Sequence, residues 1–506
     1  RIANVKTSST DKDASSAFLK YEDFSHYADY FNGMEDENIV QAIPNAKASE
    51  WMEENIPLFE CPQHNFEEMY YYRWWSLRKH IKETPVGYGM TEFLIQRSYS
   101  DKYNLIACAI GHHIYESRWL RDPKYLDQII HTWYRGNDGG PMKKMDKFSS
   151  WNADAILARY MVDGDKDFML DMAKDLETEY QRWERTNRLK NGLYWQGDVQ
   201  DGMEESISGG RKKKYARPTI NSYMYGNAKA LSLMGILSGN EGMAMKYGMR
   251  ADTLKSLVEN DLWNTRHQFF ETVRIDSSAN VREAIGYIPW YFNLPDTTKK
   301  YEVAWKEIMD EKGFSAPYGL TTAERRHPEF RTRGVGKCEW DGAIWPFASA
   351  QTLTAMANFM NNYPQTVLSD SVYFRQMELY VESQYHRGRP YIGEYLDEVT
   401  GYWLKGDQER SRYYNHSTFN DLMITGLIGL RPRLDDTIEV NPLIPADKWD
   451  WFCLDNVLYH GHNLTILWDK NGDRYHCGKG LRVFVDGKEA GHADTLTRLV
   501  CENALK

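Results

Sequence analysis

The chain has 506 residues, 42% of them hydrophobic, so it is long enough to bury a large core in one helical domain with an accessory module. Its formal charge of -10 argues against nucleic acid or an anionic membrane as the main partner. No run approaches the roughly 20 apolar residues that span a bilayer. The unusual feature is aromatic content, with 17 tryptophans and 34 tyrosines, because aromatic rings suit the apolar faces of sugars.

The six cysteines form no C-x-x-C pair, so the sequence predicts no zinc or thioredoxin-type site. Their spacing indicates no disulfide framework, although it leaves single disulfides open. We expect neither a metal nor an organic cofactor. The chain begins at Arg1 without an initiator methionine or a signal peptide, so we expect any targeting segment to lie outside it.

Residues 1–60 are acidic and polar, and we expect an N-terminal arm with short helices that partly wraps the main domain. From Phe66 the composition becomes helical, and breakers divide residues 61–430 into about twelve helices in six consecutive pairs. The expected helices lie near 66–82, 103–117, 123–135, 151–163, 165–188, 219–238, 241–262, 283–293, 301–310, 342–362, 368–386 and 415–429.

The connections between these helices alternate in length. Short turns such as Asp163-Gly164 and Gly239-Asn240 contrast with long loops at 136–150, 189–217, 313–341 and 387–414. Six helical hairpins in a ring would place the short turns at one rim and the long loops, where function concentrates, at the other. An irregular helical bundle is the alternative, and the lack of a fixed-period repeat argues against a solenoid.

Residues 431–506 are expected to form a small β module packed on the helical domain, because prolines and turn residues replace the helical pattern. The expected strands are 437–440, 464–468 and 481–485, with turns at 469–473 and 486–487.

Two loops carry clustered carboxylates, at 201–210 and 391–398. The first holds Asp201, Glu204 and Glu205, and the second holds Glu394, Asp397 and Glu398. Hydrolysis of a glycosidic bond uses one carboxyl group as general acid and another as base or nucleophile. The residues alone leave the choice within each loop open, since most acidic loop residues are caps or solvated charges.

Three motifs, in order, resemble the six-hairpin glycosidases, in particular the trehalase and family 63 glycoside hydrolase group and its mannosylglycerate-hydrolase-like relatives. Gly202-Met203-Glu204-Glu205-Ser206 is similar to the group's Ser-Gly-Trp/Met-Asp-x-Ser acid motif, with Glu in place of Asp. Glu394 begins a stretch to Gly401 that resembles the group's base motif. Trp340-Asp341-Gly342-Ala343-Ile344-Trp345-Pro346 is similar to a pocket-lining Trp-Arg-Gly-Pro-Ile-Trp stretch.

The resemblance covers roughly residues 66–430 and implies an (α/α)6 barrel whose long loops close a pocket. It implies an exo-acting, inverting glycoside hydrolase with Glu204 as general acid and Glu394 as general base. Asp201 is the alternative acid, because glutamate is one methylene longer than the aspartate of the motif. Asp341 stands where the group commonly has arginine, which implies an altered substrate contact.

Other residues near these motifs are candidates for substrate binding, although helix capping and structural ion pairing are equally open to several. The candidates are Glu92, His113, Trp151, Asn152, Trp195, Gln196, Arg217, Trp340, Asp341 and Trp345.

The expected partner is an oligosaccharide or polysaccharide, and the expected location is the periplasm, the cell surface or the exterior. One alternative function is a polysaccharide lyase or sugar epimerase on the same barrel, which would use His or Tyr and Arg rather than two opposed carboxylates. Another is a non-catalytic carbohydrate-binding scaffold, which would keep the aromatic residues without needing both Glu204 and Glu394.

Overall fold

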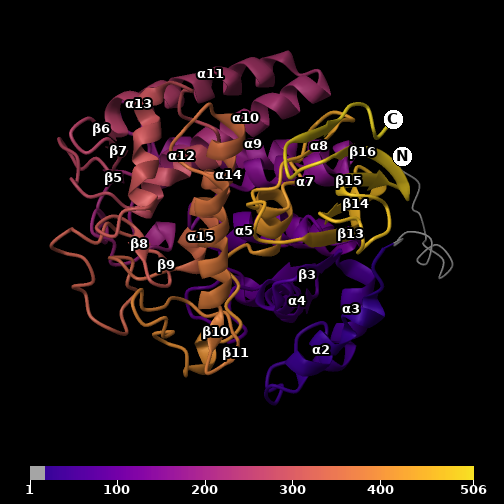
Figure 1. Ribbon diagram of the computed structural model, residues 1–506. Helices are drawn as coiled ribbons and strands as arrows, with labels where there is room; N and C mark the ends of the chain where they lie inside the picture. Colours follow the sequence, from indigo (N-terminus) through magenta and orange to yellow (C-terminus); the bar gives the residue numbers. More distant parts are fainter. Residues whose placement is uncertain (1–17) are drawn as a thin grey trace.

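Helix boundaries follow the breakers of the sequence in the computed structural model, which describes residues 18–506 (Figure 1). The chain is mainly helical, and a sheet follows near the C-terminus. The helices are α2 (Ser25–Asn32), α3 (Ala48–Asn55), α4 (His64–Lys79), α5 (Ile110–Ser117), α6 (Lys124–Arg135), α7 (Asn152–Asp163), α8 (Lys166–Asp171), α9 (Ala173–Asn187), α10 (Pro218–Ser238), α11 (Glu241–Leu257), α12 (Ile288–Tyr291), α13 (Lys299–Glu302), α14 (Pro346–Asn362), α15 (Asp370–Ser383) and α16 (Asn420–Leu422).

The two short turns expected from glycine are present. Helix α7 ends at Gly164 with φ 69°, and α10 ends at Gly239 with φ 73°, a left-handed conformation that glycine adopts without steric cost. Asn240 then caps α11, because its side chain accepts the backbone N–H of Met243.

Several expected helices are shorter than predicted, and each has a local cause. The helix expected from 342 begins only at Pro346, which fits the first helical position after the extended Trp345. The helix expected from 103 begins at Ile110, because Tyr103 and Asn104 have positive φ. The segments expected at 283–293, 301–310 and 415–429 contain single α-turns joined to 3-10 or π turns.

Every second helix packs in a circuit within the described residues. Helix α5 packs on α7, α7 on α10, α10 on α12, α12 on α14, α14 on α16, and α16 again on α5. The intervening helices lie outside this circuit: α11 and α9 pack on α10, α15 packs on α14, and α4 packs on α15 and α16. Long connections lead into each circuit helix, so these loops gather at one end of the circuit.

The long connections are stiffened by short two-stranded hairpins. These are β2–β3 (Ile81–Thr84, Gly87–Met90), β4–β5 (Trp195–Gln196, Tyr215–Ala216), β6–β7 (Trp263–Asn264, Phe269–Phe270), β8–β9 (Ser315–Ala316, Gly319–Leu320) and β10–β11 (Tyr385–His386, Arg389–Pro390). Their cross-strand hydrogen bonds fix the loops on which functional side chains depend.

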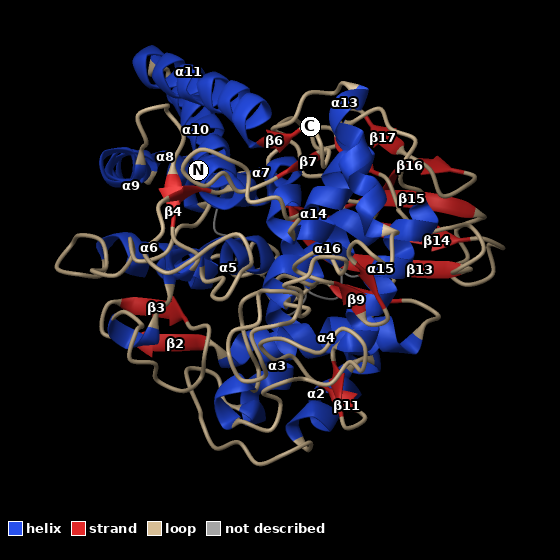
Figure 2. Cartoon of the chain, turned by 90° about the vertical axis from the view of Figure 1, so that its left-hand side faces the viewer, coloured by secondary structure: helices blue, strands red, loops and turns tan. Residues whose placement is uncertain are grey.

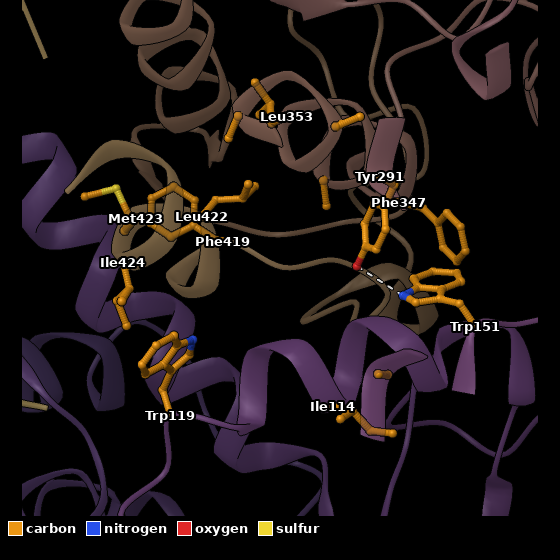
Figure 3. Packing of buried hydrophobic residues seen from close by; sticks show 14 of the residues in the cluster. Ile114, Trp119, Trp151, Tyr291, Phe347, Leu353, Phe419, Leu422, Met423 and Ile424 are labelled. Atoms are coloured by element: carbon orange, nitrogen blue, oxygen red, sulfur yellow. Dashed lines mark hydrogen bonds between the residues drawn. The ribbon is translucent and has the colours of Figure 1, made fainter. Parts of the chain in front are cut away.

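The core of the circuit is aromatic (Figure 3). Trp151, at the start of α7, is fully buried and donates its indole N–H to the hydroxyl of Tyr291 at 3.1 Å. The rings of Tyr223 and Phe347 pack around the same indole, at 4.9 and 6.1 Å between centroids. Many of the chain's aromatic residues therefore serve the core rather than a sugar.

The C-terminal sheet has the order β1-β13-β14-β15-β16, and it lies beside the helices on the opposite side from β2 and β3 (Figure 2). Its strands are β13 (Trp451–Tyr459), β14 (His462–Asp469), β15 (Gly480–Val485), β16 (Lys488–Ala493) and β1 (Leu58–Glu60), with a separate pair β12–β17 (Ile438–Val440, Leu499–Cys501). The sequence missed β1, β13, β16 and β17. The expected turn at Asp486-Gly487 joins β15 to β16, and both residues have positive φ.

Strand β1 pairs antiparallel with β13, so the described end of the N-terminal arm joins the C-terminal sheet. The first 17 residues of the expected arm lie outside the described part of the chain. Helix α2 packs on α4, which ties the arm to the helical body. None of the helices in residues 18–506 has the length and apolar character needed to cross a bilayer.

Candidate active site

Three glutamates lie in three different long connections. Glu92 precedes α5, Glu204 precedes α10 and Glu394 precedes α16. They lie close enough for their charges to interact. Burial raises the pKa of Glu204 and of Glu92 most; Glu394 raises the pKa of Glu204 further, and Glu394 and Glu204 raise the pKa of Glu92 further. The loops at one end of the helix circuit therefore bring these carboxyl groups together.

The Glu204 loop is held from both sides. Gly202 and Glu205 have positive φ, at 72° and 67°, so the chain turns sharply before and after the pair between them. Met203 is fully buried and anchors this turn. Glu204 is thereby fixed at the tip of a short constrained segment rather than on a mobile loop.

Glu204 has no ion-pair partner among residues 18–506, and only its own backbone amide contributes a hydrogen bond to its carboxylate. Burial raises its pKa to about 7, and the negative charges of Glu394 and Asp198 add to that effect. The carboxyl group therefore keeps its proton at mildly acidic pH, as a general acid must.

Asp201, only three residues away, lies in a different environment. Its side chain is fully buried and accepts Nε of Arg217 at 2.7 Å, the hydroxyl of Ser149 at 2.7 Å and that of Thr219 at 2.6 Å. Arg217 is equally buried and also reaches Ser208 at 3.2 Å. This ion pair links the loop to the first turn of α10, so both residues have structural partners.

The Glu394 loop is built on aromatic packing. The ring of Tyr395 stacks on Trp345, with centroids 4.6 Å apart and planes 16° apart. Leu396 pairs through its backbone with Ile344, with N to O distances of 2.9 and 3.0 Å. A side chain at Gly393 would overlap the ring of Trp403, because a Cβ there would lie 2.8 Å from it. The glycine therefore allows Glu394 to be presented beside a packed wall.

Glu394 faces a cation and a thiol. Nζ of Lys405 lies 3.6 Å from Oε2, and Sγ of Cys338 lies 4.0 Å from Oε1. Burial raises the pKa of Glu394, while Lys405 first and then Arg410 and Arg97 oppose that rise. The cations favour the ionised form, which suits a base.

The other two carboxylates of this loop have structural partners. Oδ1 of Asp397 accepts the backbone N–H of Val399 at 3.0 Å and of Thr400 at 2.8 Å, so it caps a turn. Glu398 forms an ion pair with Arg331. Glu394 is therefore the carboxylate of the three that faces the other two loops.

Glu92 lies behind these groups and is almost fully buried. Its oxygens accept the thiol of Cys108 at 3.4 Å and the hydroxyl of Tyr414 at 3.2 Å. Burial raises its pKa to about 8, and Glu394 and Glu204 add to the rise. Glu92 is thus protonated and neutral at pH 7.

His113 is placed behind Glu92 rather than as a free base. Its Nε2 lies 2.8 Å from the carbonyl of Asn415, and the N–H of Asn415 donates to the carbonyl of Glu92 at 2.9 Å. Burial lowers the pKa of His113 to about 4, so the imidazole is neutral.

Trp340 and Trp345 form one aromatic wall with Tyr395. The two indoles stack with centroids 4.7 Å apart, and Trp345 continues the stack to Tyr395 beside Glu394. Asp341, which was predicted to contact substrate, has a structural partner instead. It is buried, and its Oδ2 accepts the backbone N–H of Arg333 at 2.9 Å. Its contacts hold the loop at 331–333.

The remaining candidates differ in their surroundings. Trp151 belongs to the core, and Asn152 donates to Glu179 of α9 at 3.0 Å. Trp195 is half-buried in β4, with the ammonium group of Lys214 5.0 Å from its ring, so it offers a partly open aromatic face. Gln196 is buried and accepts the N–H of Gly197 at 3.1 Å.

Sequence reasoning missed Cys338, Lys405 and Tyr414, which surround the carboxylates. Cys338 immediately precedes the Glu339-Trp340 segment, so its position beside a recognised motif was the available signal. Lys405 and Tyr414 follow Glu394 at no motif spacing, so only the folded loop reveals them. Within the described residues, no group of three histidine, cysteine or carboxylate side chains is arranged to hold a metal ion.

The arrangement offers a protonated carboxyl, a cation-supported carboxylate and an aromatic wall. The family model of the mannosylglycerate hydrolase MGH1-like glycoside hydrolase domain matches residues 102–417. This chain belongs to that glycoside hydrolase family. The assignment decides for a glycosidase and against the lyase, the epimerase and the non-catalytic scaffold that the sequence left open. A second model, the C-terminal domain of glycosyl hydrolase family 65, matches residues 430–492, which hold most of the sheet.

The glycosidase is also similar to solved structures. One chain, named sialidase, is 97% identical over 98% of this chain, with a TM-score of 0.98, but the match covers 46% of that chain. The glycosidase thus spans just under half the length of that relative.

Two other solved structures share the fold only. A family 63 mannosylglycerate hydrolase from Thermus thermophilus, in complex with Tris and D-glycerate, is 12% identical over 71% of this chain and 100% of its own, with a TM-score of 0.55. A family 78 rhamnosidase from a Bacillus species is 11% identical over 85% of this chain and 41% of its own, with a TM-score of 0.56.

Proposed function

We propose that this chain removes a terminal sugar from a glycan by an inverting mechanism, with Glu204 as general acid and Glu394 as general base. The observation that carries the proposal is the contrast between the two carboxyl groups. Within residues 18–506 Glu204 has no cation paired with it and a pKa of about 7, whereas Glu394 has Lys405 at 3.6 Å. Environments that push two carboxyl pKa values apart are those that assign acid and base roles.

In the proposed cycle Glu204 gives its proton to the departing glycosidic oxygen while Glu394 removes a proton from the attacking water. The water's oxygen bonds to the anomeric carbon from the opposite face, so the configuration inverts. We propose that Glu92, neutral at pH 7, donates a hydrogen bond to a sugar hydroxyl, and that the wall of Trp340, Trp345 and Tyr395 shapes the pocket.

We further propose that the circuit α5, α7, α10, α12, α14 and α16 is the inner ring of an (α/α)6 barrel. The closed order of contacts and the alternation with outer helices support this architecture. Long loops that converge on a buried carboxylate cluster favour a pocket, and therefore exo action, over an open cleft.

The name of the longer sialidase relative raises sialic acid as a candidate substrate. The centre of the site argues for a neutral sugar, because a sugar's own carboxylate would lie beside the ionised Glu394 that acts as the proposed base. A location in the periplasm, at the cell surface or outside the cell stays a prediction that follows from a glycan substrate.

The test is a screen of aryl glycosides and oligosaccharides with the wild type, Glu204→Gln and Glu394→Gln. Each variant is expected to lose about 10²–10⁴-fold in rate, because each removes one proton transfer. The matched control is Glu205→Gln, which changes the adjacent carboxylate of the same loop, one with no ion-pair partner among residues 18–506. A Glu204 or Glu394 variant that hydrolyses at the wild-type rate would remove that residue from its role.

The pH profile and the product anomer test the mechanism separately. Activity is expected to fall as pH rises through about 7, because Glu204 must be protonated, and to fall at low pH, where Glu394 gains a proton. NMR of the first-released anomer should show inversion. A retained product would point to a covalent intermediate instead.

A further inference from the structure

Three arginines without a carboxylate partner in residues 18–506 lie in the loops that supply the three glutamates. Each comes from a loop that also supplies one of the three glutamates. The loop before α5 holds Glu92 and Arg97, the loop before α10 holds Glu204 and Arg211, and the loop before α16 holds Glu394 and Arg410. We call Arg97, Arg211 and Arg410 the rim arginines.

The contacts of Arg97 place it near the site. Its guanidinium packs over the rings of Phe93 and Tyr99, at 5.4 Å from each centroid. The ring of Phe93 lies 4.5 Å from that of Tyr414, whose hydroxyl binds Glu92. Its Nε donates to the hydroxyl of Tyr99 at 3.4 Å, and stacking on the rings orients the guanidinium while leaving the terminal N–H donors for another group.

The other two rim arginines have few internal contacts. Arg410 lies in the short 3-10 turn Glu409–Ser411, and its Nε donates to Gln408 at 3.1 Å. Arg211 is exposed at the tip that follows Gly210. Their charges reach the catalytic groups, since Arg410 opposes the rise that burial causes in the pKa of Glu394, and Arg211 does the same for Glu204.

Lysines extend this positive rim. Lys212, Lys213 and Lys214 follow Arg211, and Lys337 precedes Cys338; in the part of the chain that the structure describes, none has a carboxylate within ion-pair distance. The nearby Arg331, in contrast, pairs with Glu339, Asp397 and Glu398. The loops that supply the three glutamates thus also carry cations without an internal carboxylate partner in the described residues.

We propose that this rim binds anionic groups of the aglycone, so that the preferred substrate is a neutral terminal sugar attached to an oligosaccharide that carries uronate carboxylates. The inference rests on the proposed function and names the substrate class of that same site. Guanidinium groups bind carboxylates through paired charge-assisted hydrogen bonds, and the ionised Glu394 at the centre would repel the same carboxylates. Charge therefore sets the direction in which the glycan enters. Sulfate esters share this chemistry and form a separate arm of the test.

The test measures binding without turnover, using the full chain with Glu394→Gln. The probes are a trisaccharide with a neutral galactose at its non-reducing end followed by two galacturonates, the methyl ester of this trisaccharide, and a sulfated trisaccharide with the same neutral end, titrated by calorimetry at low and high salt. The acid is expected to bind about tenfold more tightly than its methyl ester, and salt should reduce the difference. The triple variant Arg97→Ala, Arg211→Ala, Arg410→Ala should lose this preference.

The matched control removes three exposed lysines on distant elements, Lys166→Ala, Lys246→Ala and Lys488→Ala, and should keep the preference. The proposal would be overturned if the acid and its methyl ester bound equally tightly. It would also be overturned if the arginine and the lysine triple variants lost the preference for the acid to the same extent. Tight binding of the sulfated probe alone would overturn the uronate assignment. Because binding needs no turnover, these results are separate from the activity of the Glu204 and Glu394 variants.

Discussion

The Glu204 loop and the Glu394 loop meet in one site but treat their carboxylates in opposite ways. In the first loop, Arg217 forms an ion pair with Asp201, and Glu204 has no cation paired with it in the described residues. In the second, Asp397 and Glu398 have structural partners, while Lys405 lies beside Glu394. The proposed acid and the proposed base therefore differ in whether their loop places a cation beside them.

The first loop also shows that neighbouring carboxylates can have very different surroundings. Asp201 and Glu204 are three residues apart, yet one is saturated with hydrogen bonds and the other has none from another residue between 18 and 506. Motif spacing alone left both open as the acid. Their hydrogen-bond partners separate them: Asp201 is paired with Arg217, and Glu204 has no cation paired with it in residues 18–506.

The largest effect is expected from Asp201→Ala. It leaves Arg217 buried without its counter-ion, and breaking a buried pair on one side costs about 3–5 kcal/mol of folding stability. The expected result is a markedly lower melting temperature, measured by scanning calorimetry. Glu205→Ala, in the same loop, serves as the control with little change.

The rate of the folded Asp201→Ala protein tests the comparison between the two carboxylates. Hydrolysis per folded molecule should stay within an order of magnitude of wild type, because Glu204 is intact. An unchanged melting temperature together with a loss of about 10²-fold or more in rate would make Asp201 the acid.

Lys405→Met is expected to have the next largest effect. Lys405 opposes the rise that burial causes in the pKa of Glu394, so its removal lets that pKa rise further above its ordinary value. A base must be ionised, so the acidic limb of the kcat/KM profile should move to higher pH. Arg410 and Arg97 also act on Glu394, which limits the shift. Lys246→Met, on α11, is the control, and an unmoved acidic limb would contradict the role given to Lys405.

The sequence predicted most helices because local residues determine where those helices begin and end. Gly164, Gly239 and Pro346 fix helix ends through backbone conformation, which depends little on the rest of the chain. Strand β1 was missed because its short run, Leu58–Glu60, carries no alternating pattern and owes its conformation to β13, which lies near the other end of the chain.

The candidate site could be predicted where a motif contained the residue, and could not be predicted where packing chose the partner. Motifs pointed to Glu204, Glu394, Trp340 and Trp345, and their catalytic and binding roles stay predictions. Trp151 and Asp341 fell in or beside motifs too, but the fold uses the first in the core and the second to hold a loop. The position of Lys405 beside Glu394 could not be predicted from the sequence and is seen only in the folded structure.

The smallest effect is expected from Glu92→Gln, and it tests whether the site has two working carboxyl groups or three. Burial and the neighbouring glutamates keep Glu92 protonated at pH 6, so glutamine reproduces its charge and nearly its shape. The rate at pH 6 should stay within about threefold of wild type, whereas Glu92→Ala should lose about tenfold through the missing hydrogen bond. A loss near that of Glu394→Gln would mean that Glu92 acts as an anion, and the base would have to be reassigned between the loops before α5 and α16.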